Sequence, residues 1–301
     1  MKRKFNFGLI LFVFSASLAF ADGFKPTSKP VVLPSGTDGS YGTKGTYVLF
    51  GDWPQTVKAD DITVSSEPEN INGFECYKGS DGYYYVKAEA EPYDYFYEFS
   101  TGNYIDFNEV YYFKIEPIKW RVVTNNYQGG KLLVAENILA AKYYDSDSNN
   151  NYKNSEIRAW LLEDFLNSAF TKEAIDSINT VTVDNSVKST GDSENGFVCE
   201  NTKDKIFLLS VKELLTSSYG FKTVTWDEDT ARCRKTTDYS RATGSYASSN
   251  GGYKFNGWWW LRTPYNRNAY YGKGITSGGD IMDYYLDENR RGVVPALSIS
   301  F

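Results

Sequence analysis

Histidine is absent from this chain. Its absence excludes mechanisms that need an imidazole as a base or a metal ligand, such as Ser-His-Asp hydrolysis, Cys-His proteolysis and histidine-ligated zinc. Cysteine is scarce, with only Cys76, Cys199 and Cys233. Because this number is odd, at most one intramolecular disulfide can form. We predict that it joins Cys199 to Cys233 and that Cys76 is a small buried hydrophobe.

Beyond residue 21 the chain also lacks an apolar run long enough to cross a membrane. The first 21 residues have the parts of an export signal, with basic Lys2-Arg3-Lys4, an apolar run over 5–18 and the small-x-small site Ala19-Phe20-Ala21. We predict cleavage after Ala21, with an uncleaved anchor as the alternative. The mature protein is then expected in the periplasm, on the cell surface or outside the cell, without a transmembrane span.

Basic blocks are missing as well. Three of the 32 basic residues lie in the export signal, so the mature chain carries 29 basic and 38 acidic residues, a net charge of −9. An acidic surface repels phosphate backbones. This charge balance excludes nucleic acid as a partner.

The remaining sequence divides into a short leader and one domain. Residues 22–45 contain Pro and Gly steps without periodicity, which predicts a leader that is flexible or irregularly packed. We expect a single domain over 46–301, with a strand-rich insertion at about 57–110. Alternating apolar and polar residues predict two strands, over 111–117 and 118–123, around the Glu116-Pro117 step.

Helical patterns appear in the middle of the chain. Ile157, Trp160, Leu161 and Phe165 fall on one helical face, and Ser155 precedes them as a predicted N-cap. A second short helix is expected over 171–178. Ser210-Val-Lys-Glu213 has the pattern of a capping box that opens a third. Strands combined with two or three short helices predict an α+β fold.

Two apolar segments organise the C-terminal part. Gly257-Trp258-Trp259-Trp260-Leu261-Arg262-Thr263-Pro264 is typical of a strand buried on both faces, with one charged side chain and a proline as its stop. Residues 292–301, which contain Pro295, predict a last strand inside the domain. Residues 269–286 between them are expected to form a hairpin around Ser277-Gly278-Gly279-Asp280.

Several motifs along the chain resemble those of a known family. They are Phe50-Gly-Asp-Trp-Pro-Gln-Thr56, Pro117-Ile-Lys-Trp-Arg121, Ser155-Glu-Ile-Arg-Ala-Trp-Leu161, Asp204-Lys-Ile-Phe-Leu-Leu-Ser210, Arg232-Cys-Arg-Lys-Thr-Thr-Asp-Tyr239, Trp259-Trp-Leu-Arg-Thr-Pro264 and Gly292-Val-Val-Pro-Ala-Leu297. In order and spacing they resemble domain-of-unknown-function family 6273, a family of bacterial exported and surface proteins. The family has a Trp-Trp-Leu-Arg-Ser-Pro strand and a terminal Gly-Val-Arg-Pro-Ala-Leu. Thr263 and Val294 therefore depart from its pattern.

The resemblance implies a C-type-lectin-like fold of the formylglycine-generating-enzyme type, in which the N- and C-terminal strands pair. Proteins of this fold present ligand surfaces near the C-terminus, which here implies 266–290 as the contact region. The ligand-binding candidates are Tyr265, Asn266, Arg267, Asn268, Tyr270, Tyr271, Asp283, Tyr284 and Tyr285. Tyrosine and short amides suit such contacts because rigid rings cost little entropy and amides adapt their hydrogen bonds. An ordinary solvated hairpin is the alternative.

The sequence points to no catalytic cofactor. Formylglycine-generating activity needs a closely spaced late cysteine pair, and no cysteine follows Cys233. The one metal hypothesis is Ca²⁺ at a loop starting at Asp145, with oxygen ligands in the register of a twelve-residue calcium loop. Its candidate ligands are Asp145, Asp147, Asn149 and Glu156. Asn150 would replace the usual glycine, since asparagine adopts left-handed conformations.

We therefore predict a non-enzymatic binding protein of the cell envelope with a protein or carbohydrate ligand, bound by the C-terminal hairpin and the loop at 222–257. One alternative is an envelope polysaccharide hydrolase with paired carboxylates, for which the candidates are Asp280, Asp283, Asp287 and Glu288. Another is a passive component of a surface structure. The binding-protein hypothesis is favoured because the sequence has a tryptophan scaffold and lacks recognisable catalytic groups.

Overall fold

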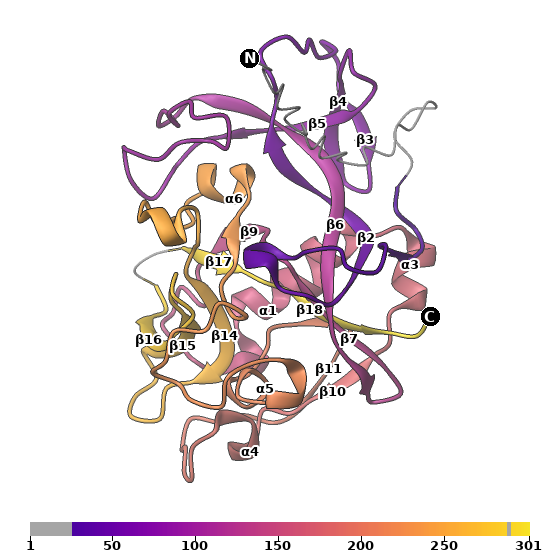
Figure 1. The fold of residues 1–301 in the computed structure, drawn as a ribbon. Coiled ribbons are helices and arrows are strands. Elements are labelled where there is room, and N and C mark those ends of the chain that lie inside the picture. Colours follow the sequence, from indigo (N-terminus) through magenta and orange to yellow (C-terminus); the bar gives the residue numbers. More distant parts are fainter. Residues whose placement is uncertain (1–25, 288–289) are drawn as a thin grey trace, which may run out of the picture.

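The computed structural model describes residues 26–287 and 290–301. The predicted export signal, the first residues of the leader and Glu288 lie outside the described residues. Two main sheets and several short helices make up most of the described chain, so the predicted α+β class is confirmed (Figure 1). No helix among the described residues is long and apolar enough to cross a membrane.

The larger sheet has nine strands in the order β12-β18-β7-β6-β5-β4-β3, with β2 on the other edge of β6 and β1 beyond it. Its strands are β1 (Val31–Val32), β2 (Thr46–Val57), β3 (Glu69–Ile71), β4 (Phe74–Lys78), β5 (Tyr84–Glu89), β6 (Val110–Tyr127), β7 (Gly130–Ala135), β12 (Ile206–Phe207) and β18 (Ala296–Ile299). The expected insertion at 57–110 contains β3, β4 and β5, which extend this sheet upward in Figure 1.

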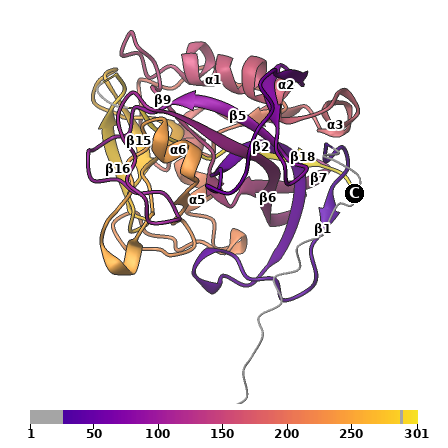
Figure 2. The ribbon, with the colours of Figure 1, turned by 90° about the horizontal axis from the view of Figure 1, so that it is seen from above.

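The smaller sheet has five strands in the order β16-β15-β14-β17-β9, and it carries the predicted hairpin. Its strands are β9 (Ala140–Lys142), β14 (Trp259–Pro264), β15 (Tyr271–Ile275), β16 (Ile281–Tyr285) and β17 (Arg291–Val293). Two further pairs are β10 (Val181–Val183) with β11 (Thr202–Asp204), and β8 (Asn137–Ile138) with β13 (Lys235–Thr236). The hairpin β15–β16 lies at the margin of the molecule in both ribbon views (Figures 1 and 2).

The helices are short, and two of them begin at the capping residues that the sequence predicts. They are α1 (Glu156–Trp160), α2 (Leu166–Ala169), α3 (Lys172–Ser177), α4 (Val187–Thr190), α5 (Val211–Leu214) and α6 (Asp238–Ala242). A π-helical turn, Leu161–Phe165, joins α1 to α2. Ser155 caps α1 by accepting a hydrogen bond from Arg158 N, and Ser210 forms the predicted capping box with Glu213. One helix, α6, lies in the segment 222–257, which the sequence predicts to be a loop.

The two strands predicted around Pro117 are one strand, β6, of 18 residues. A proline interrupts a sheet when its missing N–H is needed by the ladder, and it is tolerated at an irregularity. Pro117 lies opposite Asp52, beside a register shift in β2 between Leu49 and Asp52. The irregular partner strand therefore accommodates the proline, and β6 continues through it.

The expected pairing of the first and last strands is also different. β2 pairs with β6, whereas β18 pairs with β7 and β12, so that β6 and β7 separate β2 from β18. The closing segment itself is divided at Val294-Pro295 into β17, in the smaller sheet, and β18, in the larger. The C-terminal residues thus connect the two sheets.

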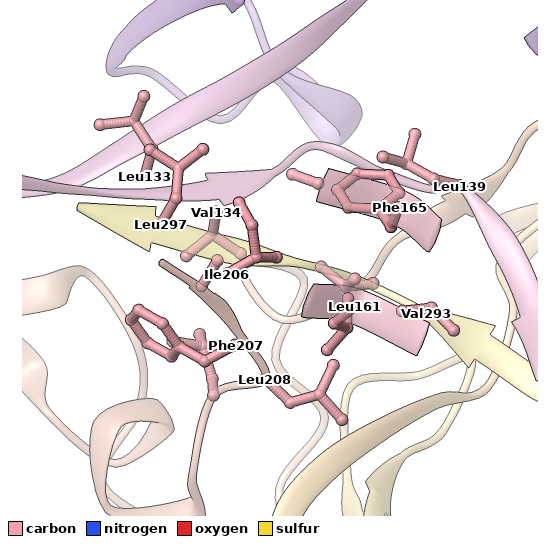
Figure 3. Packing of buried hydrophobic residues seen from close by; sticks show 14 of the residues in the cluster. Leu133, Val134, Leu139, Leu161, Phe165, Ile206, Phe207, Leu208, Val293 and Leu297 are labelled. Atoms are coloured by element: carbon pink, nitrogen blue, oxygen red, sulfur yellow. The ribbon is translucent and has the colours of Figure 1, made fainter. Parts of the chain in front are cut away.

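One hydrophobic core lies between the sheets and the helical segment 156–169. Figure 3 shows its centre, where Leu161 and Phe165 of the helical segment face side chains of β7, β12 and β18. Trp259 and Trp260 are completely buried in this core together with Val293 and Leu297. Trp258, which precedes β14, is in contrast only half-buried.

Residues 26–45, the expected leader, lie against the larger sheet. β1 pairs with β2, and Thr27 donates from its N–H and its hydroxyl to the Asp52 carboxylate, at 2.6 and 2.9 Å. Ser40 N–H donates to Glu136 at 2.5 Å. Because Asp52 is only 4 % exposed, its contacts with Thr27 are shielded from water.

Candidate functional site

The β15–β16 hairpin and the adjacent Tyr265 place four of the nine predicted ligand residues on one face. In its register Tyr271 lies opposite Tyr285 and Lys273 opposite Asp283, and side chains two apart point to the same side of a strand. The Tyr271 ring lies 4.0 Å from the Tyr285 ring and 5.7 Å from the Tyr265 ring, between centroids. We call Tyr265, Tyr271, Lys273, Asp283 and Tyr285 the hairpin face.

The charges on the hairpin face neutralise each other. Lys273 Nζ lies 2.5 Å from Asp283 Oδ1 and 5.2 Å from the centroid of the Tyr265 ring. Both side chains are partly shielded, which holds the pair in one geometry more firmly than at an open surface. The face therefore offers rigid aromatic area around a single ion pair, and it carries no net charge of its own.

Tyr284, another predicted ligand residue, lies on the opposite side of the hairpin. Its ring stacks on Trp258 at 5.6 Å, and the Arg291 guanidinium lies 3.9 Å from its centroid. Gly274 makes this possible, since a Cβ at that position would come within 2.9 Å of the Tyr284 ring. Burial raises the pKa of Tyr284 despite the opposing effect of Arg291. Tyr284 therefore supports the hairpin instead of extending its outer face.

The connection between β14 and β15 completes the candidate surface. Asn266, Arg267 and Tyr270 are exposed, and the exposed fraction of Tyr270 is 60 %. Asn268 is half-buried, and its side-chain oxygen accepts a hydrogen bond from Tyr270 N–H at 3.0 Å. The predicted contact residues of this connection thus lie beside the hairpin face, with Asn268 shaping the turn.

Asn150 holds this connection in place, which the sequence did not reveal. Its side-chain N–H group lies within hydrogen-bonding distance of the carbonyl oxygens of Tyr265, Asn268 and Tyr271, at 3.4, 3.0 and 2.9 Å. Its backbone N–H donates to Ala269 O at 3.0 Å. Only 2 % of Asn150 is exposed, so this amide anchors the ligand loop from within the protein.

The proposed calcium loop is thus connected to the hairpin through Asn150. The side-chain oxygens of the loop, however, accept hydrogen bonds from backbone N–H groups of the same loop. Asp145 accepts from Asn149 N–H at 3.2 Å, and Asn149 accepts from Asn151 N–H at 3.0 Å. Glu156 accepts from Ser146 N–H at 3.1 Å, while Asp147 is exposed. Over 26–287 and 290–301, no group of three or more Asp, Glu, Cys or His side chains is arranged to hold a metal ion.

Two details of that loop differ from the calcium hypothesis. The residue with a left-handed backbone is Ser148, with φ of 55°, and Asn150 does not adopt this conformation. Burial raises the pKa of Asp145, and backbone N–H groups, among them that of Asn149, oppose this rise. The carboxylate of Asp145 is therefore part of the internal hydrogen bonding of the loop.

The predicted disulfide is not formed, and all three cysteines are free thiols. Cys233 donates to the carbonyl oxygens of Asp229 and Ser277, whereas Cys199 lies beside Tyr152 and Lys153. The two thiols therefore belong to different parts of the fold, which sequence spacing could not show. Burial raises the pKa of Cys233 to about 12 and that of Cys76 to about 11, so both thiols are unreactive.

The remaining predicted structural residues fix β14 and β18. Arg262, 3 % exposed, donates to Leu208 O and to Glu213, both at 2.6 Å. Pro264 ends β14, and its carbonyl accepts from Asn195 at 3.2 Å. Pro295 lies between β17 and β18, and its carbonyl accepts from Ala135 N–H at 3.0 Å.

Thr263 and Val294, the two positions at which the sequence was expected to differ from the motifs that it resembles, are buried. Thr263 Oγ1 accepts a hydrogen bond from Val211 N–H at 2.9 Å, a bond that a serine hydroxyl would also accept. Val294 is completely buried. The nearby arginines contact other groups, since Arg290 pairs with Glu91 and Arg291 lies over Trp258, Trp260 and Tyr284.

The carboxylates considered for hydrolysis have other partners. Asp283 pairs with Lys273, and Asp280 accepts a hydrogen bond from the Thr276 hydroxyl at 3.0 Å. Asp287 is exposed, and Glu288 lies outside the described residues. A glycosidase needs one carboxyl group as an acid and a second as a base or nucleophile across the same bond. Asp280 and Asp283 thus already have structural partners. Each would have to give up its partner in order to act in glycoside hydrolysis.

A stack of aromatic rings behind the hairpin was missed by the sequence reasoning. Tyr246 stacks on Trp258 at 3.9 Å with an interplanar angle of 12°, and Tyr93 from the strand-rich insertion contacts both rings at their edges. The three residues are far apart in sequence, so no local pattern could indicate the contact. The stack ties residues 91–98 to the base of the hairpin.

A model of one protein family, described as a domain of unknown function (DUF6273), matches residues 128–301, which is more than half of the chain. No curated protein and no solved structure matches the chain.

Proposed function

Because the chain belongs to this family of domains of unknown function, we propose a role from its own surface: an exported, non-enzymatic binding protein that holds a protein partner on the hairpin face. The observation that carries the proposal is the contact among the rings of Tyr265, Tyr271 and Tyr285 around the Lys273–Asp283 pair. Tyrosine is enriched in the cores of protein interfaces because a rigid ring contributes area at little entropic cost.

The form of the surface favours a protein over a carbohydrate. The face is one side of a two-stranded hairpin, beside the exposed side chain of Tyr270. Tyrosine is enriched at protein interfaces, whereas small ligands prefer concave sites. Support beneath the face is rigid, because β15 pairs with β14, whose Trp259 and Trp260 are completely buried.

We also propose that the domain has a C-type-lectin-like architecture. The first strand of the matched region, β7, pairs antiparallel with the last strand, β18, and a tryptophan-rich strand runs through the second sheet. Residues before 128 add β1 to β6 to the same sheet. Export and a bacterial cell-envelope location rest on the N-terminal sequence pattern and on the motifs described above.

The test is a binding comparison between the natural protein and Tyr270→Ala/Tyr285→Ala. Each protein is immobilised and exposed to envelope proteins and, separately, to purified envelope polysaccharide from the producing cells. We expect one protein to bind the natural form, and truncation of these two exposed tyrosines to weaken its binding by about 2 kcal/mol or more, roughly thirtyfold in Kd. Tyr143→Ala, another exposed tyrosine outside the hairpin, is the matched control.

Three results would overturn this proposal. Binding of polysaccharide alone would make the ligand a carbohydrate, and release of reducing ends that disappears in Asp283→Asn would establish a hydrolase. Binding that is equal in the natural and doubly substituted proteins would remove the hairpin face from the site.

A further inference from the structure

A cleft of about 520 Å³ lies on the strand-rich insertion, away from the hairpin face. Three segments enclose it: residues 57–60 after β2, residues 99–104, and residues 110–112 at the start of β6. These segments precede the region that matches the family, so the family match says nothing of this cleft. Its volume lies in the range of pockets that enclose most of a drug-sized ligand.

The wall formed by residues 99–104 is rigid. Ser100 donates to the Asp238 carboxylate from its N–H and its hydroxyl, both at 2.7 Å. Phe99 N–H donates to Asn103 O at 2.8 Å, and the Phe99 side chain packs with Ile105 and Phe113 in a small second core. A wall held at both ends in this way keeps the cleft open without a ligand, and preorganisation of this kind favours binding.

Tyrosine rings provide the apolar surface of the cleft. Tyr104 is 64 % exposed, so its ring is accessible to a ligand. Tyr111 is fixed because its hydroxyl accepts from Asp106 N–H at 3.1 Å and its ring contacts Phe99 at 4.9 Å. Tyr112 is held edge-on by Tyr77 at 5.3 Å. A tyrosine ring has an apolar face and a polar hydroxyl group. It therefore suits a ligand that also has apolar faces next to polar groups.

The polar side chains of the cleft that remain available to a ligand are neutral or acidic. Its one cation, Lys58, donates to the carbonyl oxygens of Ala59 and Ile62, at 2.9 and 2.8 Å. Asp60 and Asn103 form no side-chain hydrogen bond or ion pair with any described residue. The cleft therefore has a carboxylate and an amide ready to bind hydroxyl groups and lacks an available cation for an anion. The excess of acidic residues in the chain adds to this preference.

We propose that this cleft is a second binding site, which takes a neutral saccharide. Sugar rings would stack their C–H faces on Tyr104 and Tyr112, and their hydroxyl groups would hydrogen-bond with Asp60 and Asn103. The site is independent of the hairpin face. A chain with both sites connects a protein partner to a neutral glycan.

The test is affinity electrophoresis of the full mature chain through native gels. Each gel contains one soluble neutral polymer, which is glucan, mannan, xylan or glycol chitin free of chitosan. A gel with polygalacturonate is the anionic comparison. We expect retardation by at least one neutral polymer. Tyr104→Ala should weaken it about tenfold, since it removes a stacking surface. Tyr143→Ala is the matched control, because it removes an exposed tyrosine outside the cleft.

Asp60→Asn provides a second variant at an exposed position, so that loss of folding cannot explain its effect. We expect it to weaken retardation while thermal unfolding stays unchanged. Tyr285→Ala should leave retardation intact, so a failure of the hairpin proposal and a failure of this one are distinguishable. Retardation by none of the neutral polymers, retardation by polygalacturonate alone, or equal retardation of Tyr104→Ala and the natural protein would overturn the proposal.

Discussion

Asp52 is a buried carboxylate with an uncharged partner. It is 4 % exposed and accepts hydrogen bonds from Thr27, and burial raises its pKa from 3.8 to about 6 despite those bonds. The folded protein therefore holds a proton on Asp52 in a pH range where the unfolded chain has lost it. The contribution of Asp52 to folding stability therefore falls as pH rises from about 4 to about 6 and stays level above that range.

The prediction concerns Asp52→Asn, which keeps an oxygen acceptor for Thr27 but cannot ionise. Relative to this variant, the natural protein should gain up to about 3 kcal/mol of unfolding free energy as the pH is lowered from 7 to 4. Chemical denaturation at several pH values measures the difference. Asp94→Asn removes a carboxylate at an exposed position and is the control. A difference that does not change with pH would contradict the assignment of a raised pKa to Asp52.

Residues whose role is local were predicted well from the sequence. Ser155 and the Ser210–Glu213 capping box occupy the predicted positions, because a cap is formed by residues three apart in the chain. The state of the cysteines was not predicted correctly, since a disulfide between Cys199 and Cys233 requires a contact between distant segments. The buried environments of the thiols depend on which strands and loops surround them.

At the scale of elements, the connection 265–270 has a conformation set by another loop. The Asn150 side chain donates to carbonyl oxygens of Tyr265 and Asn268 in this connection and of Tyr271 at the start of β15, and this amide is almost completely buried. Hydrogen-bond partners that are left unsatisfied in a buried site cost about 1–3 kcal/mol. The hairpin face therefore depends on a residue that does not belong to it.

Asn150→Ala tests this dependence. We expect a loss of about 1–3 kcal/mol of unfolding free energy and faster amide hydrogen exchange across residues 265–271, with weaker binding at the hairpin face. Asn149→Ala is the matched control, because the Asn149 side chain accepts only from Asn151 within its own loop. If exchange in 265–271 were the same in both variants, Asn150 would not position the connection.

At the scale of the whole molecule, the core crosses the boundary of the matched region. Val48, Phe50, Ile118 and Trp120 precede residue 128 and are completely buried in the same cluster as Trp259 and Leu297. Trp120 donates to Phe50 O at 2.7 Å, and Trp53 donates to Leu139 O at 2.9 Å. β6 also covers the edge of β7. Residues 128–301 thus have an incomplete interior by themselves.

We therefore expect a fragment of residues 128–301 to lack a cooperative unfolding transition, since it loses the partner strand of β7 and exposes part of the core. The mature chain from residue 22 is the control and should unfold in one transition. Thermal unfolding followed by circular dichroism distinguishes them. A sharp transition in the fragment would show that the matched region folds independently of the strands that precede it.

The sequence by itself determined the features that depend on neighbouring residues. The α+β class, the helix caps and the β15–β16 hairpin follow from periodicity and turn residues over short windows. Burial of Trp259 and Trp260 also follows, because an apolar run of this kind is stable only inside the protein.

Only the tertiary structure decided the features that join distant segments. These include the pairing of β18 with β7, the position of Asn150 under the ligand loop, the stack of Tyr246 on Trp258, and the cleft beside Tyr104. Each depends on contacts between residues that are separated by long stretches of chain. The free energy of such contacts is set by packing and by the loops that bring the segments together. A local sequence pattern carries no information about either of these.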